Sequence, residues 1–195
     1  MNQGQEDLLA LLATDLDSYY EQLMVTYWHQ LYTFVLRRVE SKADAEDIVL
    51  TAFERAYYAL KGFPVQRIQT LQIRPWLYKI AMSVYYKYAS KSQLPASASL
   101  NALEEESTML EIVDDEQEQP EMVLENWERR HELEALVDTL PDSYREMVSL
   151  FYFDDLSHQE IANILNQRVG TVRVYVHRAL RLLRKTLEIQ ANEVG

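Results

Sequence analysis

Apolar residues recur every three or four positions between residues 18 and 60, which is the spacing of one face of an α-helix. Two stripes are present: Leu23, Tyr27, Leu31, Phe34 and Val35 form the first, and Ile48, Ala52, Ala56 and Ala59 the second. Ser41 lies in the polar break between them and is suited to cap the second helix, which Gly62 ends. Pro75 then opens a third helix that runs to about residue 91. The pattern predicts one compact helical domain over residues 1–91.

The periodic pattern stops after this domain and returns near Glu121. Residues 92–120 are small, polar and acidic, which predicts a flexible acidic linker. This linker is either a solvated spacer or a segment whose charge competes with DNA for basic surfaces. Helical spacing then runs to about Leu140 and resumes after a break that Asp142 or Ser143 caps. We therefore expect a second helical domain over residues 121–195.

The last part of this second domain has the pattern of a helix-turn-helix. Ser157 and Glu160 have the spacing of a capping box, which marks the start of a helix. Asn166 suits a left-handed turn position, and Thr171 is a natural N-cap for the helix that follows. That helix carries one apolar stripe, comprising Val172, Val176, Ala179, Leu183 and Leu187.

The composition favours an all-α fold and excludes several classes of protein. The 195 residues include 4 Gly, 5 Pro and no Cys, and 48% are hydrophobic. Disulfides and thiolate metal sites are therefore excluded. The four histidines lack ligand or triad spacing and no glycine-rich phosphate loop is present, so we expect no enzyme and no cofactor. An acidic N-terminal segment and the lack of a long apolar run predict a cytoplasmic protein without membrane insertion.

The net charge of −12 is spread unevenly along the chain. Residues 92–128 contain eleven acids and no Lys or Arg, whereas residues 55–103 and 161–187 contain no acid. The chain thus has two separate basic segments with an acidic connector between them.

The basic face of the last helix is suited to DNA. An arginine can pair with guanine through two hydrogen bonds, and Val174 offers an apolar contact to a thymine methyl group. The alternative is a basic helical hairpin that only packs or binds an acidic partner. The candidate DNA-binding residues here are Arg168, Thr171, Arg173, Val174, Tyr175, His177, Arg178 and Arg181.

Three segments resemble bacterial RNA polymerase sigma factors of the extracytoplasmic-function (ECF) class, in the sigma-70 family. The segment LPDSYREMVSLFYFDDLSHQEIANILNQRVGTVRVYVHRALRLLRKTL resembles the C-terminal module that recognises the −35 promoter element. The segment YWHQLYTFVLRRVESKADAEDIVLTAFERAYYAL resembles the polymerase-docking segment, and RPWLYKIAMSVYYKY resembles the helix that melts and holds the −10 element. The resemblance implies a sigma factor that directs polymerase to promoters.

The resemblance also implies residue roles. Asp44, Glu46 and Asp47 would bind a coiled coil of the polymerase, near a helix N-terminus that itself favours acids. A separated DNA strand is held by aromatic stacking and by cations that bind phosphate. The residues implied for the −10 module are Arg67, Arg74, Lys79, Tyr85, Tyr86 and Lys87.

The chain departs from the common family pattern at two places. Met82-Ser83 stands where members commonly have Arg-Asn, and Val174-Tyr175 replaces a polar residue and an arginine. Both modules are therefore less basic than usual, which predicts altered promoter choice and weaker or partner-dependent melting.

The resemblance implies three partners: the RNA polymerase core, promoter DNA and a helical anti-sigma factor that wraps both domains. Two rival functions remain open, a stand-alone dimeric helix-turn-helix regulator and a sigma-like decoy without promoter activity. An acidic chain should bind DNA weakly alone, so we expect polymerase to deliver both modules to the promoter.

Overall fold

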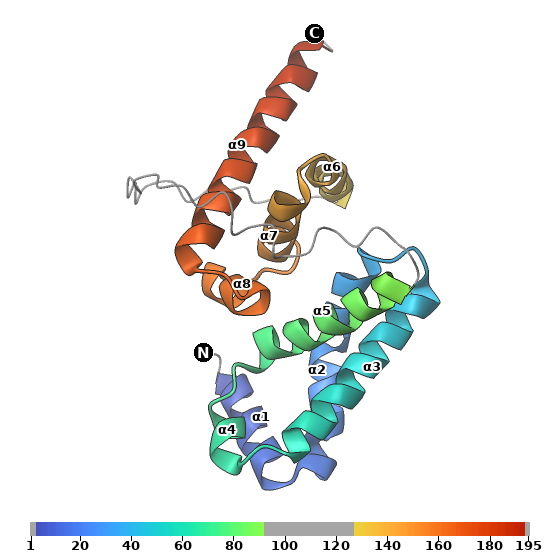
Figure 1. Ribbon diagram of the computed structural model, residues 1–195, viewed down its shortest axis with the longest axis vertical. Helices are drawn as coiled ribbons and strands as arrows, with labels where there is room; N and C mark the ends of the chain where they lie inside the picture. Colours follow the sequence, from blue (N-terminus) through green and yellow to red (C-terminus); the bar gives the residue numbers. More distant parts are fainter. Residues whose placement is uncertain (1–2, 92–126, 194–195) are drawn as a thin grey trace. The chain divides into compact units, whose positions relative to one another are not determined.

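The structure is a computed structural model that describes residues 3–91 and 127–193 of the chain. Within these ranges every regular element is an α-helix, so the predicted all-α class is confirmed (Figure 1). The predicted linker, residues 92–120, lies outside the described ranges. The described helices fall into two compact units: one contains α1 to α5 together with Gln159–Gln167, and the other contains α6, α7 and α9.

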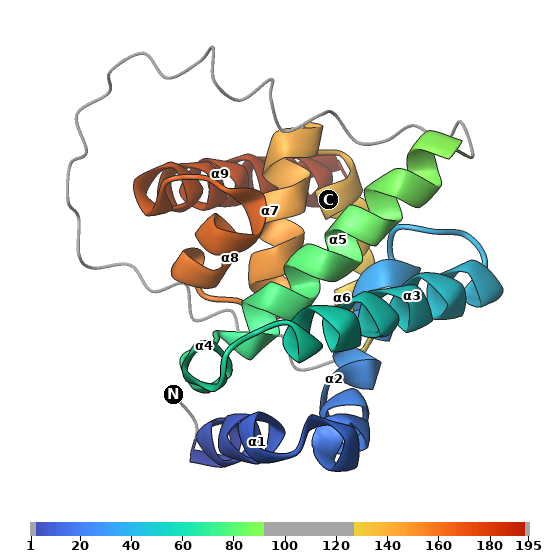
Figure 2. The same ribbon diagram turned by 60° about the horizontal axis from the view of Figure 1, so that its bottom comes forward.

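The first unit is built around three long helices. Its elements are α1 (Gln3–Thr14), α2 (Leu16–Leu36), α3 (Lys42–Lys61), α4 (Val65–Gln69) and α5 (Ile73–Lys91). Helix α3 packs against both α2 and α5, and α1 packs against α2 and α4 (Figure 2). The predicted apolar stripes form the core, where Leu23, Leu31 and Phe34 are fully buried.

Side-chain caps fix where two of these helices begin. The Ser41 hydroxyl accepts a hydrogen bond from the Asp44 amide at 3.3 Å, which confirms Ser41 as the N-cap of α3. Asp15 caps α2 by accepting from the Ser18 amide at 3.1 Å, and its hydrogen bonds to Ser18 lower the pKa of Asp15. Each cap satisfies an amide that would otherwise lack a partner at the helix start.

Two tyrosines tie the start of α2 to α3. The Tyr20 hydroxyl donates to the Phe53 carbonyl in the buried interface. The Tyr57 hydroxyl donates to Asp17 Oδ1 at 2.5 Å and accepts from Lys61 Nζ at 2.9 Å. The α2–α3 pair is therefore held by specific hydrogen bonds as well as by apolar packing.

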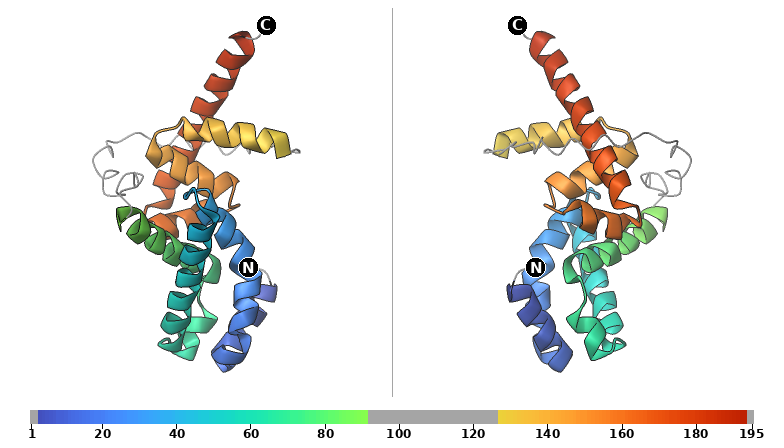
Figure 3. Two further views of the ribbon diagram at one scale, coloured as in Figure 1. Left: turned by 90° about the vertical axis from the view of Figure 1, so that its right-hand side faces the viewer. Right: turned by 90° about the vertical axis from the view of Figure 1, so that its left-hand side faces the viewer.

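The second unit contains α6 (Trp127–Asp138), α7 (Asp142–Tyr152) and the long α9 (Val169–Glu193). Figure 3 shows α6 running transverse to α9, and both α6 and α7 pack against α9. The core that joins them consists of Leu136, Val137, Leu140, Val148, Ala179 and Leu183.

Helix α8 (His158–Leu165) begins directly after Ser157, the residue that was predicted to cap it. Asn166 has a φ of 54°, which confirms the predicted left-handed turn between α8 and α9. Two other cap predictions were wrong. Helix α7 begins at Asp142 with Pro141 as its N-cap, and Thr171 lies inside α9, whose first turn closes when the Val172 amide donates to Arg168 O.

Candidate nucleic-acid interface

Helix α9 presents a continuous row of cations. Arg173, His177, Arg181 and Arg184 are exposed and follow one another at spacings of four, four and three residues. Arg178 lies beside this row, and Arg168 is exposed just before the helix. Four members of the predicted stripe, Val172, Val176, Ala179 and Leu183, are buried on the other side of the helix, whereas the fifth, Leu187, is 39% exposed. One face thus anchors the helix while the other offers charge and donors to phosphates and base edges.

Three other candidates on this helix are only half-exposed. Thr171 and Val174 are partly buried. The ring of Tyr175 stacks on that of Tyr144 in α7, with centroids 5.0 Å apart and planes 29° apart. The expectation that Tyr175 meets DNA therefore changes, because its ring is engaged inside the unit and lies away from the cation row.

His158 connects the start of α8 to α7. Its ring stacks on Phe151 with centroids 4.7 Å apart. Burial, and to a smaller extent the charge of Arg173, hold the pKa of His158 below its usual value. The neutral imidazole is therefore the form that this packing favours.

The candidate −10 residues on α5 differ in exposure. Lys79 and Lys87 are exposed, and Arg74 and Tyr86 are partly exposed. Tyr85 is 6% exposed, so it presents no free ring face for a base, and its sequence-based role as a stacking residue is withdrawn. Its ring lies 5.5 Å from that of Tyr86, which is left as the more accessible tyrosine of the pair.

An aromatic and cationic cluster extends from Phe63 through α4 to the first turn of α5, and the sequence interpretation found only part of it. The Arg67 guanidinium lies 3.7 Å from the centroid of the Phe63 ring, and the Phe63 and Trp76 centroids are 5.9 Å apart. Arg67 is exposed, whereas Phe63 and Trp76 are half-buried. Phe63 was missed, although an aromatic residue between Gly62 and Pro64 in a polar loop was the available signal.

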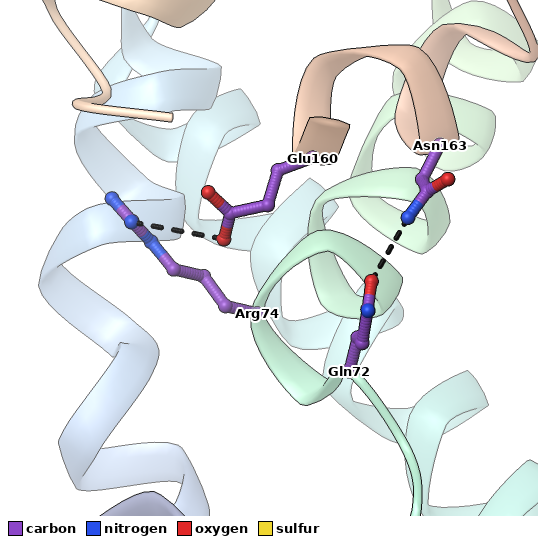
Figure 4. Close-up of polar contacts among 4 residues, drawn as sticks. All are labelled: Gln72, Arg74, Glu160 and Asn163. Carbon is purple, nitrogen blue, oxygen red and sulfur yellow. Dashed lines mark hydrogen bonds and ion pairs between the residues drawn. The ribbon is translucent and has the colours of Figure 1, made fainter. Parts of the chain in front are cut away.

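Two polar contacts join the start of α5 to α8 within the first unit (Figure 4). Arg74 Nη1 lies 3.9 Å from Glu160 Oε1, and Asn163 Nδ2 donates to Gln72 Oε1 at 2.9 Å. Arg74 therefore has a carboxylate beside it in this arrangement. A capping-box glutamate and a candidate phosphate-binding arginine are brought together from positions far apart in the sequence.

The candidate polymerase-binding acids lie in the first turns of α3. Glu46 and Asp47 are exposed, and Asp44 is partly buried. Leu50 follows one turn later and is 49% exposed, an apolar residue that the sequence interpretation did not single out. Phe53 is 1% exposed and belongs to the core.

Residues 3–91 and 127–193 hold no group of three or more His, Cys, Asp or Glu side chains arranged to bind a metal ion. In the same ranges no helix combines the length and apolar character that crossing a bilayer requires.

Sequence comparison assigns two segments of the chain to known modules. The family description "Sigma-70 region 2" matches residues 23–94, and "Sigma-70, region 4" matches residues 130–183. The chain is 32% identical over 162 residues to the ECF RNA polymerase sigma factor SigW of Bacillus subtilis, covering 83% of this chain and 84% of that protein. It is 33% identical over 158 residues to the ECF RNA polymerase sigma-E factor of Escherichia coli K12, covering 80% of each chain.

Solved structures support the fold. The structure of CnrH in complex with the cytosolic domain of CnrY superposes with a TM-score of 0.62 at 18% identity, over 96% of this chain and 99% of that chain. The sigma factor RpoE of Bartonella quintana, solved with the anti-sigma factor NepR, gives a TM-score of 0.57 at 19% identity, over 87% and 97% of the two chains. The helical fold and the two sigma-70 modules define an all-α transcription protein. The chain belongs to the ECF class of RNA polymerase sigma factors in the sigma-70 family.

Proposed function

We propose that this sigma factor directs the RNA polymerase core to promoters by using α9 for the −35 element and the α4–α5 region for the −10 element. The cation row on α9 is the observation that carries this proposal. Arg173, His177 and Arg181 share one exposed face, and the opposite face of the helix is buried. A helix of this kind can lie in the major groove, where arginines contact phosphates and guanine edges.

The −10 role rests on cations and aromatics placed close together. Arg67, Lys79 and Lys87 are exposed cations suited to phosphates of a separated strand. Phe63 lies beneath the Arg67 guanidinium, and Tyr86 adjoins Lys87 in sequence. Both rings are partly exposed, and we propose them as stacking residues instead of Tyr85. The role of Arg74 depends on release from Glu160, because a carboxylate competes with phosphate for the guanidinium.

The start of α3 is the proposed docking surface for polymerase. The exposed carboxylates of Glu46 and Asp47 offer charge, and the neighbouring Leu50 offers apolar area that a partner can bury. Apolar contacts at the centre and charges at the rim are the usual composition of a protein interface. The partially buried Asp44 also serves the helix end, where acids are favoured.

The partners follow from this assignment. We propose a cytoplasmic initiation factor that performs no reaction of its own and that an anti-sigma factor holds inactive. The sigma factor RpoE of Bartonella quintana, which shares this fold, was crystallised in complex with its anti-sigma factor NepR, and this supports the proposal. A stand-alone dimeric regulator is disfavoured, because it leaves the region 2 match unexplained.

Run-off transcription with core polymerase on a promoter library tests the proposal. The wild-type chain should give transcripts from promoters that share a −35 and a −10 element. Arg173→Ala should lower output by about five- to a hundredfold, the range expected when a good base contact is lost. The matched control is Arg55→Ala, which removes a partly exposed arginine from α3 and should leave output near the wild-type level. No transcript from any promoter, despite tight binding to core, would instead identify a decoy.

A further inference from the structure

Helix α1 lies outside the segment that matches sigma-70 region 2, which begins at residue 23. Three of its leucines are nevertheless fully part of the core: Leu8 is 4% exposed, Leu9 is 5% and Leu12 is 1%. This buried stripe faces two helices, because α1 packs against α2 and against α4 (Figure 2).

Helix α4 depends on such a neighbour. It has five residues, no side-chain hydrogen bond at its Pro64 N-cap, and a single buried side chain, Ile68. Isolated helices this short are unstable in water, so tertiary contact decides whether one forms and where it lies. Its hydrogen bonds are local: the Thr70 hydroxyl, for example, donates to the Gln66 carbonyl at 3.0 Å. Such a bond stabilises the helical turn but does not connect α4 to the rest of the unit.

The exposed side of α4 carries a residue of the proposed −10 surface. Arg67 adjoins the anchor Ile68 in sequence, and its guanidinium lies over the Phe63 ring. Phe63 in turn contacts Trp76 at the start of α5. The position of α4 therefore sets where Arg67 and Phe63 stand relative to the cations of α5.

We propose that α1 is a positioning element for −10 recognition, with Leu12 and its neighbours supporting α4 so that Arg67 and Phe63 meet the separated DNA strand. This inference rests on the proposed −10 role of Arg67. Leu12 touches no DNA in this scheme and acts through α4.

A matched pair of cavity variants separates this role from a loss of stability. Leu12→Ala and Leu31→Ala remove the same atoms from fully buried sites, at 1% and 0% exposure. Helix α1 is roughly 18 Å long and packs along α2 from the start of α2. Leu31 lies about 22 Å from that start, which is beyond the reach of α1. The two variants therefore create cavities of similar size, and they differ mainly in how close the cavity lies to α1 and α4.

The measurement is the affinity of the holoenzyme for a fluorescent single-stranded −10 oligonucleotide. It is made for the wild type, Leu12→Ala and Leu31→Ala, each with and without the additional substitution Arg67→Ala. In the wild-type and Leu31→Ala backgrounds, Arg67→Ala should weaken binding about tenfold. In the Leu12→Ala background it should weaken binding by about twofold or less, because Arg67 is already displaced. Affinity for core polymerase should stay within about twofold in all variants. Leu12→Met, which keeps the volume, should restore the tenfold effect of Arg67→Ala.

If Arg67→Ala weakens binding equally in the Leu12→Ala and Leu31→Ala backgrounds, α1 has no positioning role and the inference fails. If Arg67→Ala has no effect in the wild-type background, the proposed −10 role of Arg67 fails and the inference falls with it. Should Leu12→Ala not fold, as circular dichroism would show, Leu12→Val against Leu31→Val repeats the comparison with smaller defects at the same two sites. The weakened effect of Arg67→Ala is then expected in the Leu12→Val background alone.

Discussion

Single residues in this protein take roles that sequence type alone does not reveal. Tyr175 lies on the helix proposed to contact the −35 element, yet its ring is stacked on Tyr144. Tyr85 belongs to a tyrosine-rich stretch suited to base stacking, yet it is 6% exposed. In both cases the residue type is suited to contact DNA, but the side chain packs against its neighbours within the protein. Aromatic residues contribute large apolar area, so the core competes for them with any binding surface.

His158 gives the second unit a pH dependence. Its folded-state pKa lies below the ordinary value because burial against Phe151, and then the charge of Arg173, disfavour the imidazolium. The stabilising contribution is therefore complete above about pH 6.5, the unfolded value, and is lost as the pH falls below it. Chemical denaturation from pH 7.5 to about pH 5 should show the wild type losing stability relative to His158→Gln.

The second variant is His177→Gln, which removes an exposed histidine of α9 instead of the partly buried one. A pH dependence that is lost in His158→Gln and persists in His177→Gln belongs to His158. A wild-type curve that runs parallel to that of His158→Gln over the whole range would contradict the assignment.

At the scale of elements, the long amphipathic helices were predictable and the short ones were not. The stripes of α2 and α3, the Ser41 cap and the left-handed Asn166 follow from periodicity and local chemistry. Helix α1 was left unassigned, because a short apolar run does not by itself distinguish a helix from other buried segments. The sequence does not predict helix α4, since its one buried side chain leaves no periodic pattern.

The candidate surface shows the same division. Charge and spacing predicted the cation row of α9, since exposed residues on a regular helix follow its period. The acids of α3 were expected from the family resemblance. Leu50 could not be predicted as a surface residue, because its exposure depends on how neighbouring helices cover it. The Arg74–Glu160 pair depends on tertiary packing between distant segments and leaves no local pattern.

The Ser41 cap offers a test of how far α3 relies on its first turn. Ser41→Ala removes the acceptor for the Asp44 amide, and the free energy of unfolding should fall by about 1 kcal/mol. Ser83→Ala, on the exposed side of α5, should change it by less than about 0.5 kcal/mol. Urea denaturation of both variants provides the measurement, and equal losses would show that the cap bond is not the cause.

At the scale of the whole molecule, the distribution of charge makes DNA recognition depend on prior binding to polymerase. The chain has a net charge of −12, although α9 and residues 55–103 are locally basic. Long-range repulsion from DNA opposes binding by the free protein, and attachment to polymerase raises the local concentration of both modules at the promoter.

This balance predicts a strong dependence on polymerase. In gel-shift titrations the free chain should bind promoter DNA weakly, and adding core should produce tight, sequence-dependent binding. For the holoenzyme, Arg181→Ala should reduce the slope of log affinity against log salt by about 1, the change expected for one lost phosphate contact. Equally tight and specific binding by the free chain would overturn the tethering mechanism.

The contacts between α5 and α8 have a practical consequence for engineering. Gln72 and Arg74 belong to the region 2 segment, whereas Glu160 and Asn163 belong to the region 4 segment. A hybrid sigma factor that joins region 2 of one relative to region 4 of another would therefore take one residue of each pair from each parent. Designs that transplant promoter specificity should carry the matching residues of both pairs together, or replace all four with neutral side chains of similar size.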